Sequence, residues 1–218
     1  MSDTSSRSGA RYDTLAVSAY VDRIHAAHDR GLARAFATPA DMPAIQVGQS
    51  DGRLLHLIAK LVGATKIVEV GTLAGYSAIQ LATAMPAGGG GGHVWSIEFN
   101  AKHADVAREN VAAAGLADRV TITTGAGRDV LPTLEPHGPF DLVFIDADKA
   151  NYEHYGRWAL THLRRGGVVI GDNAYFFGDL LADTDGARSM RGFHELVGAA
   201  CDSVCAPTPD GLVIGIKK

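Results

Sequence analysis

The 218-residue chain has only two cysteines, no block of basic residues and no apolar run long enough to cross a membrane. With 20 Lys and Arg against 24 Asp and Glu, the formal net charge is -4, which argues against binding nucleic acid through charge. The first ten residues also lack the apolar stretch of a signal peptide. We therefore expect a cytoplasmic protein with small-molecule chemistry and with neither a nucleic-acid nor a membrane partner.

The cysteines themselves, Cys201 and Cys205, lie in a segment whose pattern predicts extended backbone. Four residues at about 3.3 Å each place the two Cα atoms about 13 Å apart, too far for a disulfide. We expect two reduced, packed thiols. No cluster of Cys and His with zinc-site spacing occurs.

Glycine, in contrast, is abundant, with 26 of 218 residues, about 12% where about 7% is usual. The glycines keep no three-residue period, which excludes collagen, and enough apolar residues remain to build a core. The longest run, Gly88–Gly92, follows Pro86 and precedes a predicted strand. A phosphate-binding loop opens a helix instead, so we interpret this run as a connector.

Short β-branched runs alternate with helical segments through the middle of the chain, which predicts a parallel sheet with right-handed crossovers. The predicted strands are Lys66–Val70, His93–Ile97, Arg119–Thr123, Phe140–Ile145 and Gly167–Ile170. The helices between them are Tyr76–Ala84, Lys102–Ala114, Arg128–Leu134 and Tyr152–Leu163. Helical periodicity also marks Tyr12–Phe36, Ser50–Val62 and Ala187–Ala199. The tail adds two strands, Asp202–Ala206 and Gly211–Ile216, close enough to form a hairpin at the sheet edge.

One predicted strand runs into a glycine-bearing turn and then a helix, at Ile67–Ser77. Such corners bind ligands in open α/β sheets. A dinucleotide fingerprint needs glycine where Leu73 stands, and no Gly-Lys-Ser/Thr of a Walker loop follows. Glu69 and Glu98 end two successive strands, and a carboxylate at the second position accepts both hydroxyls of a ribose. The corner therefore suits a nucleoside without pyrophosphate, such as S-adenosylmethionine, with other Rossmann-like ligands still open.

Carboxylates and an amide follow two other successive strands. Asp146 comes directly after the strand Phe140–Ile145, and Asp172 and Asn173 follow the next strand, 26 residues further on. If these strands are parallel neighbours about 4.8 Å apart, the three side chains converge at their carboxyl ends. An all-oxygen set favours Mg²⁺, Mn²⁺ or Ca²⁺ over zinc. The alternative is that each residue only caps the helix that follows it.

The chain resembles the cation-dependent O-methyltransferases of the catechol and caffeoyl-CoA type. The resemblance runs from roughly Ala44 to the C-terminus and rests on Glu69–Ser77, Phe140–Tyr152, Gly171–Asn173 and Asp210–Leu212. It implies a Rossmann-like, doubly wound α/β sheet, mostly parallel, with an antiparallel C-terminal edge hairpin and helices on both faces. It also implies a homodimer. The expected organisation is a flexible N-terminus (1–11) and a single methyltransferase domain (12–218), with N-terminal helices (12–62) and an α/β core (63–218).

The same resemblance, matched residue by residue, implies roles for individual positions. The methyl donor is S-adenosylmethionine, with contacts from Val47, Glu69, Gly71, Thr72, Gly75, Ser77, Glu98, Gly127 and Asp146. Asp146 lies between donor and metal, and Asp172 and Asn173 complete the metal ligands. Lys149 matches the catalytic base beside Asp146, the alternative being a solvated lysine at a helix start.

Two departures from the family pattern concern the ends of the site. Gly127 stands where the family has alanine beside the adenine, so a contact there comes through backbone. Phe176 stands where tryptophan is common, and with Tyr175 and Phe177 it is expected to form an aromatic wall against a planar acceptor. The alternative for this triplet is ordinary core packing.

The sequence thus predicts an enzyme that moves the methyl group of S-adenosylmethionine to a hydroxyl of a small, vicinal dihydroxy aromatic acceptor with the help of a divalent cation. Two alternatives remain at this point. A nicotinamide-dependent oxidoreductase is disfavoured by Leu73, and a non-catalytic donor-binding module is disfavoured by the presence of both the metal set and Lys149.

Overall fold

The computed structural model describes residues 14–86 and 92–218. The predicted flexible N-terminus and most of the Gly88–Gly92 connector lie outside these residues. The helical stretch predicted as Tyr12–Phe36 is two helices, α1 (Leu15–His25) and α2 (Arg30–Phe36). The helix is interrupted between them because Asp29 has extended backbone and caps α2. Its Oδ1 accepts a hydrogen bond from the Leu32 N–H at 2.9 Å.

In the described residues, seven strands form one sheet in the order β3-β2-β1-β4-β5-β7-β6. The first five strands pair in parallel, whereas β7 pairs antiparallel with both β5 and β6, as predicted for the C-terminal hairpin. Their bounds are β1 (Lys66–Val70), β2 (His93–Glu98), β3 (Val120–Thr124), β4 (Phe140–Ile145), β5 (Leu163–Gly171), β6 (Cys201–Ala206) and β7 (Leu212–Lys217). The strand order reverses between β1 and β4, where open α/β sheets bind ligands.

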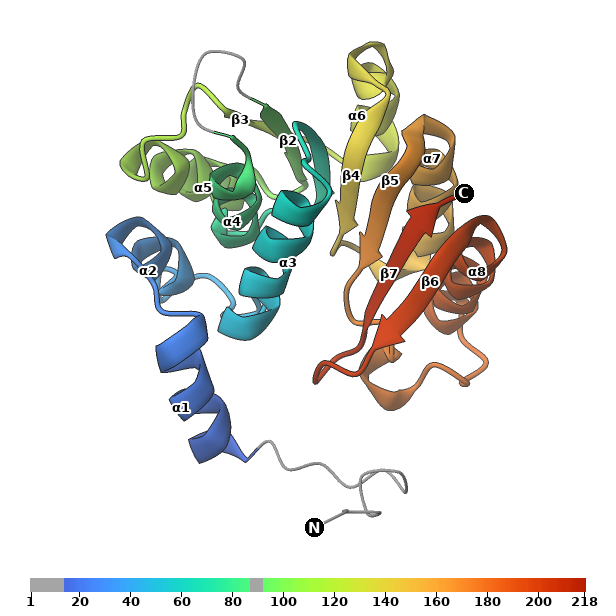
Figure 1. Ribbon diagram of the computed structural model, residues 1–218, viewed down its shortest axis with the longest axis horizontal. Coiled ribbons are helices and arrows are strands. Elements are labelled where there is room, and N and C mark those ends of the chain that lie inside the picture. The colour runs from blue at the N-terminus through green and yellow to red at the C-terminus, as the bar shows by residue number, and fades with distance from the viewer. Residues whose placement is uncertain (1–13, 87–91) are drawn as a thin grey trace.

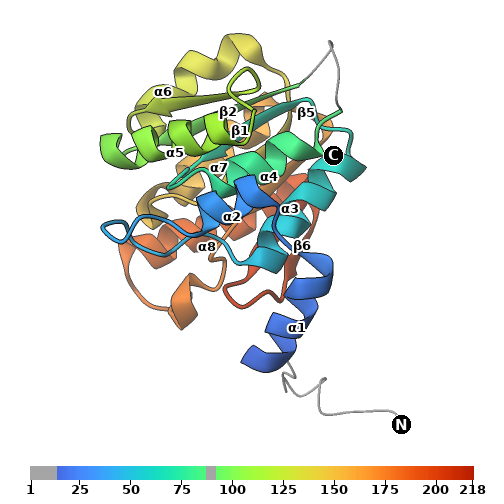
Figure 2. The same ribbon diagram turned by 90° about the vertical axis from the view of Figure 1, so that its left-hand side faces the viewer.

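Helices cover both faces of this sheet (Figures 1 and 2). The helices on the near side of Figure 2 are α2, α3 (Gln49–Leu61), α4 (Tyr76–Ala84) and α5 (Ala101–Ala113). The opposite face carries α6 (Gly127–Leu134), α7 (Tyr152–His162) and α8 (Asp185–Ala200). Successive strand residues feed the two cores in turn, Ile67 on the first face and Val68 on the second. The doubly wound α/β class is therefore confirmed.

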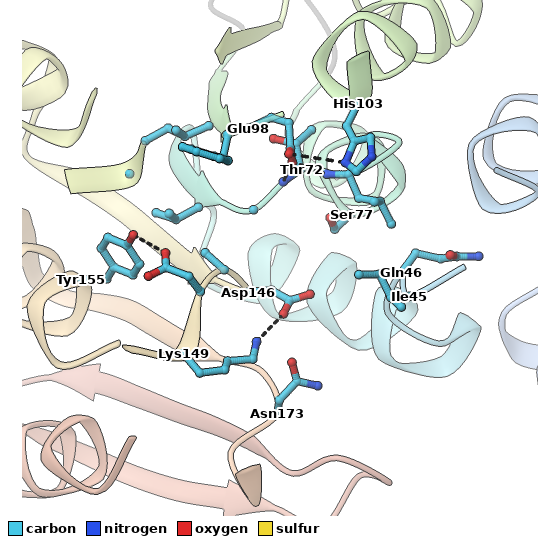
Figure 3. A pocket seen from close by; sticks show the side chains of 18 of the residues that line it. Ile45, Gln46, Thr72, Ser77, Glu98, His103, Asp146, Lys149, Tyr155 and Asn173 are labelled. Carbon is cyan, nitrogen blue, oxygen red and sulfur yellow. Dashed lines mark hydrogen bonds and ion pairs between the residues drawn. The ribbon is translucent and has the colours of Figure 1, made fainter. Parts of the chain in front are cut away.

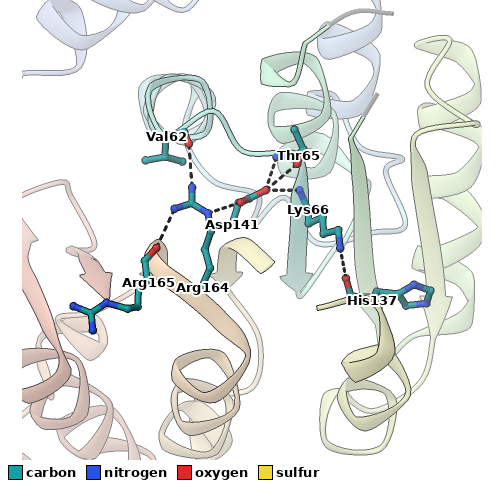
Figure 4. Close-up of polar contacts among 7 residues, drawn as sticks. All are labelled: Val62, Thr65, Lys66, His137, Asp141, Arg164 and Arg165. Atoms are coloured by element: carbon teal, nitrogen blue, oxygen red, sulfur yellow. Dashed lines mark hydrogen bonds and ion pairs between the residues drawn. The ribbon is translucent and has the colours of Figure 1, made fainter. Parts of the chain in front are cut away.

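The amino-terminal ends of the strands are tied together by Asp141 (Figure 4). Its Oδ2 accepts from the backbone N–H groups of Thr65 and Lys66 at 2.8 and 2.9 Å, and its Oδ1 accepts from Arg164 Nε at 2.6 Å. Arg164 also donates to the Val62 carbonyl at 3.3 Å. Burial acts to raise the pKa of Asp141, but the guanidinium and the N–H donors outweigh it and hold that pKa below its usual value.

Both cysteines lie on β6 and are free, Cys201 buried and Cys205 half-buried. This confirms the predicted absence of a disulfide between them. No helix among the described residues is long and apolar enough to span a membrane.

Candidate active site

The turn after β1 depends on two glycines with left-handed backbone, Gly71 at φ 99° and Gly75 at φ 85°. A Cβ atom at Gly71 would overlap the carbonyl oxygen of Asp146. The ends of β1 and β4 therefore approach closely only because position 71 has no side chain. Leu73, between the two glycines, also has a positive φ of 50°, an uncommon conformation for a branched residue that marks a constrained turn.

Glu98, at the end of β2, holds this turn in place (Figure 3). Its Oε2 accepts from the backbone N–H groups of Thr72 at 3.1 Å and Leu73 at 2.8 Å. Its Oε1 accepts from the Asn100 N–H at 2.9 Å and lies 3.6 Å from His103 Nδ1. The predicted ribose-binding carboxylate is thus oriented by the same turn that it stabilises.

Glu69 is fully buried beneath the turn and does not line the cavity. Ser96 Oγ donates to its Oε2, and the Thr72 hydroxyl is bonded to Ser96 in turn. Its Oε1 has no hydrogen-bond partner of good geometry among the described residues, although the Ser77 hydroxyl is near enough to lower the pKa of the carboxyl group. Burial outweighs that effect, and with the neighbouring carboxylates it raises the pKa of Glu69 to about 8.

A cavity of about 860 Å³ lies over the carboxyl ends of β1, β2 and β4. It brings together most of the predicted site residues: Val47, Gly71, Thr72, Ser77, Glu98, Gly127, Asp146, Lys149 and Asn173. Glu69, Gly75 and Asp172 are not among the residues that line it. Figure 3 shows Asp146, Lys149 and Asn173 turned toward one another on one side, with Thr72, Ser77 and Glu98 on the other.

Lys149 is fixed by two hydrogen bonds. Its Nζ donates to Asp146 Oδ1 at 3.0 Å and to Tyr152 Oη at 2.9 Å. The side chain of Lys149 is only 18% exposed, so it is not the solvated lysine of the alternative interpretation. Burial raises the pKa of the fully buried Tyr152, and the nearby carboxylates of Asp146 and Asp172 raise it further, so its hydroxyl keeps its proton.

Asp172 and Asn173 follow β5 beside the end of β4, where Ile145 pairs with Gly171. Asn173 has a positive φ of 52°, a conformation that asparagine tolerates, and its N–H donates to Asp172 Oδ1 at 2.7 Å. Burial and then the charge of Asp146 raise the pKa of Asp172 to about 7. The two carboxyl groups are therefore close enough to repel each other when both are ionised.

Neither carboxylate caps a helix. The helical segments that follow β4 begin after Asp148 and Asn151 without a side-chain cap, while Asp146 accepts from Lys149 and Asp172 from its own neighbour. Within the described residues, no group of three or more His, Cys, Asp or Glu side chains is placed to hold a metal. The predicted set has two carboxylates and one amide, so its metal role stays a prediction.

The predicted aromatic wall of Tyr175 and Phe176 does not line the cavity. Phe176 packs toward Gly186 and the core on the α8 side, and Tyr175 lies against Gly211. Phe177, the third aromatic residue of this predicted group, does line the cavity and is 68% exposed. The cause is a backbone kink, because Phe176 and Phe177 both have positive φ, at 50° and 54°.

Some cavity residues were not predicted. His103, Arg128 and Tyr155 line the cavity from α5, α6 and α7, but a sequence does not say which face of each helix turns toward it. Phe99 also lines the cavity and is largely exposed. Its position directly after Glu98, at a strand end, would have allowed it to be predicted as a cavity residue.

Comparisons with known proteins give the family of the chain. A family model described as O-methyltransferase matches residues 24–199. Catechol O-methyltransferase of Mycobacterium tuberculosis is 44% identical over 176 residues, covering 80% of this chain and 78% of that relative. A protein of the same name from Niastella koreensis is 40% identical over 191 residues, covering 82% and 85%. The solved structure of an O-methyltransferase from Bacillus cereus in complex with SAH has a TM-score of 0.87 at 36% identity, covering 93% of this chain and 97% of that one. This chain therefore belongs to the O-methyltransferase family and is an S-adenosylmethionine-dependent enzyme.

Proposed function

We propose that the enzyme methylates one hydroxyl of a small catechol-like acceptor and needs a divalent cation, Mg²⁺ or else Mn²⁺ or Ca²⁺, to do so. The observation that carries this proposal is the adjacency of Asp146, Asp172 and Asn173 beside Lys149. The name of the two relatives, catechol O-methyltransferase, supports the acceptor class.

The oxygen atoms of these three side chains suit a hard divalent cation as ligands. Asp146 and Asp172 stand together at neighbouring strand ends, and their mutual repulsion adds to the burial that raises the pKa of Asp172 to about 7. A cation offsets that repulsion, and carboxylate and amide oxygens are the ligands that Mg²⁺ prefers. Bound there, it would stabilise the anion of the acceptor hydroxyl and orient two neighbouring oxygens.

Proton removal falls to Lys149. A phenol has a pKa of about 10, so its hydroxyl must lose a proton before the oxygen attacks efficiently. Lys149 Nζ lies at the cavity beside Asp146, where as the free amine it accepts that proton. The oxygen then takes the methyl group from the sulfonium of the donor, the carbon–sulfur bond breaks, and S-adenosylhomocysteine leaves as the neutral thioether.

The donor occupies the other side of the cavity in this proposal. Thr72, Ser77 and Glu98 line that side, with Glu69 supporting the turn from below. Gly127 has no room for a side chain, because a Cβ there would lie 2.8 Å from Val70 and 2.9 Å from the Tyr155 hydroxyl. Its contact with the adenine is therefore made by backbone. Of the three aromatic residues of the predicted wall, Phe177 is the one that faces the acceptor in this proposal.

We also propose a homodimer. On the α3 side of the sheet, Val204 of β6 and Ile216 of β7 remain exposed, and these strands face the viewer in Figure 1 with α8 behind them. Helix α1 buries none of its residues and exposes Leu15 and Tyr20. A second copy that covers these apolar side chains would remove them from water.

The proposal extends to organisation and location. Residues 12–218 act as a single unit, which the packing of α2 and α3 into the same core as β1 and β4 supports. The two free thiols fit the reducing conditions of the cytoplasm.

A substrate panel tests the acceptor class. With S-adenosylmethionine and Mg²⁺, we expect the enzyme to convert catechol to its monomethyl ether and to leave phenol, which lacks the second hydroxyl, essentially unreacted. Product formation is measured by mass spectrometry, with a reaction without enzyme as the control. Equal turnover of phenol and catechol would contradict the proposed use of two neighbouring oxygens.

A further inference from the structure

Tyr152 lies where the two proposed metal-ligand strands end. It is the first residue of α7 and is fully buried, with its ring edge-on to Phe193 of α8 at 5.6 Å between centroids. Its hydroxyl oxygen is 3.1 Å from the Ile145 carbonyl at the end of β4 and 3.0 Å from the Asp172 carbonyl after β5. One hydroxyl group thus joins the two backbone segments that carry Asp146 and Asp172.

The hydrogen-bond roles at this hydroxyl follow from counting protons. A tyrosine hydroxyl has one hydrogen, and both carbonyl oxygens only accept, so that hydrogen points toward the carbonyls. Its oxygen is then left to accept from Lys149 Nζ at 2.9 Å. Lys149 therefore donates a hydrogen bond to the Tyr152 hydroxyl, which in turn donates to the backbone carbonyls at the two strand ends.

Lys149 gains a defined position from this contact. Its nitrogen also donates to Asp146 Oδ1 at 3.0 Å and lies 4.8 Å from the centroid of the Tyr152 ring. Without the hydroxyl, Asp146 would be the remaining hydrogen-bond partner of Lys149 Nζ among the described residues, and a lysine side chain held by one contact can turn about several bonds. Misplacement of a reacting group by about 1 Å can cost on the order of a hundredfold in rate.

We propose that Tyr152 is a positioning residue for methyl transfer, whose hydroxyl sets the place of the Lys149 amine relative to Asp146 and the strand ends. The inference rests on the proposed role of Lys149 as the base. Tyr152 itself touches neither donor nor acceptor in this account and acts through Lys149.

The variant Tyr152→Phe isolates the hydroxyl, because it keeps the ring that packs on Phe193. We expect kcat to fall roughly tenfold, about the size expected for losing one hydrogen bond, with the donor Kd and the acceptor KM changed less than about twofold. The matched control is Trp158→Phe, a buried aromatic position on the same helix whose Nε1 has no hydrogen-bond partner in the described part of the chain. It should lower the melting temperature and leave kcat as it is.

A double-mutant cycle separates positioning from a structural role. If Tyr152 acts through Lys149, the double variant Tyr152→Phe/Lys149→Ala transfers methyl groups no more slowly than Lys149→Ala alone. Tyr152→Phe at the wild-type rate, or a loss of equal size in both backgrounds, would overturn the inference and leave the proposed function standing. An unchanged kcat in Lys149→Ala would remove the base itself and overturn the inference together with that part of the proposed function.

Discussion

At the residue scale, the missing side chain of Gly71 decides whether the two halves of the site can meet. Both its φ of 99° and the closeness of the Asp146 carbonyl oxygen disfavour any side chain at this position. We expect Gly71→Ala to lower the free energy of unfolding by roughly 3 kcal/mol or more, since the left-handed backbone alone costs about 1–2 kcal/mol and the overlap adds to it. Donor affinity should fall as well, because the turn must shift.

Gly63 provides the matched control for that prediction. It also has a positive φ, 62°, but a Cβ there would meet no atom of the residues that the structure describes within 4 Å. Gly63→Ala should therefore cost only about 1 kcal/mol of unfolding free energy and leave donor binding intact. Urea unfolding and calorimetric titration with S-adenosylmethionine measure both effects, and equal losses in the two variants would show that the close approach at Gly71 does not matter.

Asp172 carries a second prediction at this scale. Asp172→Ala should reduce cation-dependent turnover by roughly a hundredfold or more and leave donor binding largely intact, because Asp172 follows β5 and is not on the side of Thr72, Ser77 and Glu98 that is proposed to hold the donor. Asp118→Ala, at an exposed carboxylate before β3, is the control. Steady-state kinetics at several Mg²⁺ concentrations would detect the loss, and wild-type turnover in Asp172→Ala would argue against a metal ligand at this position.

The individual site residues also show where sequence reasoning ends. Glu98, Asp146 and Asn173 could be placed at the cavity because each lies at the end of a strand or within two residues after it, and parallel strands end at one edge of a sheet. Phe177 could not be distinguished from Phe176, since the choice depends on two positive φ angles in succession. No periodicity or residue preference predicts such a kink.

At the scale of elements, strands and helices were predictable where one pattern dominated. The bounds of β1, β4 and α4 match the prediction. In contrast, β5 begins at Leu163 rather than Gly167, because Leu163 pairs with Phe140 before the register shifts. Local propensity does not mark Arg164–Gly166 as a strand, and only pairing with the neighbouring strand makes it part of the sheet.

The Asp141 cluster gives a prediction for how elements are held together. Asp141→Asn should lower the free energy of unfolding at pH 7 by about 2 kcal/mol, because it removes the charge that faces Arg164 and the N–H groups of Thr65 and Lys66. The kcat per folded molecule should not change, since Asp141 lies at the opposite end of β4 from the cavity.

The pH dependence of that loss follows from the direction of the pKa shift. The pKa of Asp141 is lower in the folded protein than the usual 3.8, so the carboxylate contributes its full stabilisation above that value. The contribution disappears as the pH falls through the folded pKa. The difference between wild type and Asp141→Asn in urea unfolding should therefore shrink below about pH 3.8, and an undiminished gap in strong acid would contradict this origin.

At the scale of the whole molecule, the exposed edge of the sheet tests the proposed homodimer. Val204→Lys should convert the dimer to a monomer, because it places a charge in the apolar surface of β6 and β7. Leu181→Lys, at a largely exposed leucine outside these strands, controls for the added charge. Light scattering with size-exclusion chromatography gives the mass, and a wild-type protein that is already monomeric would contradict the proposal.

The fold, the cavity and the paired carboxylates together support dependence of methyl transfer on a divalent cation. The most direct test is the initial rate of catechol methylation after treatment with EDTA and again after Mg²⁺ is restored in excess. We expect a rate near background in EDTA, full recovery with Mg²⁺, and unchanged calorimetric binding of S-adenosylmethionine throughout. A chelated enzyme that still works at its full rate would contradict it.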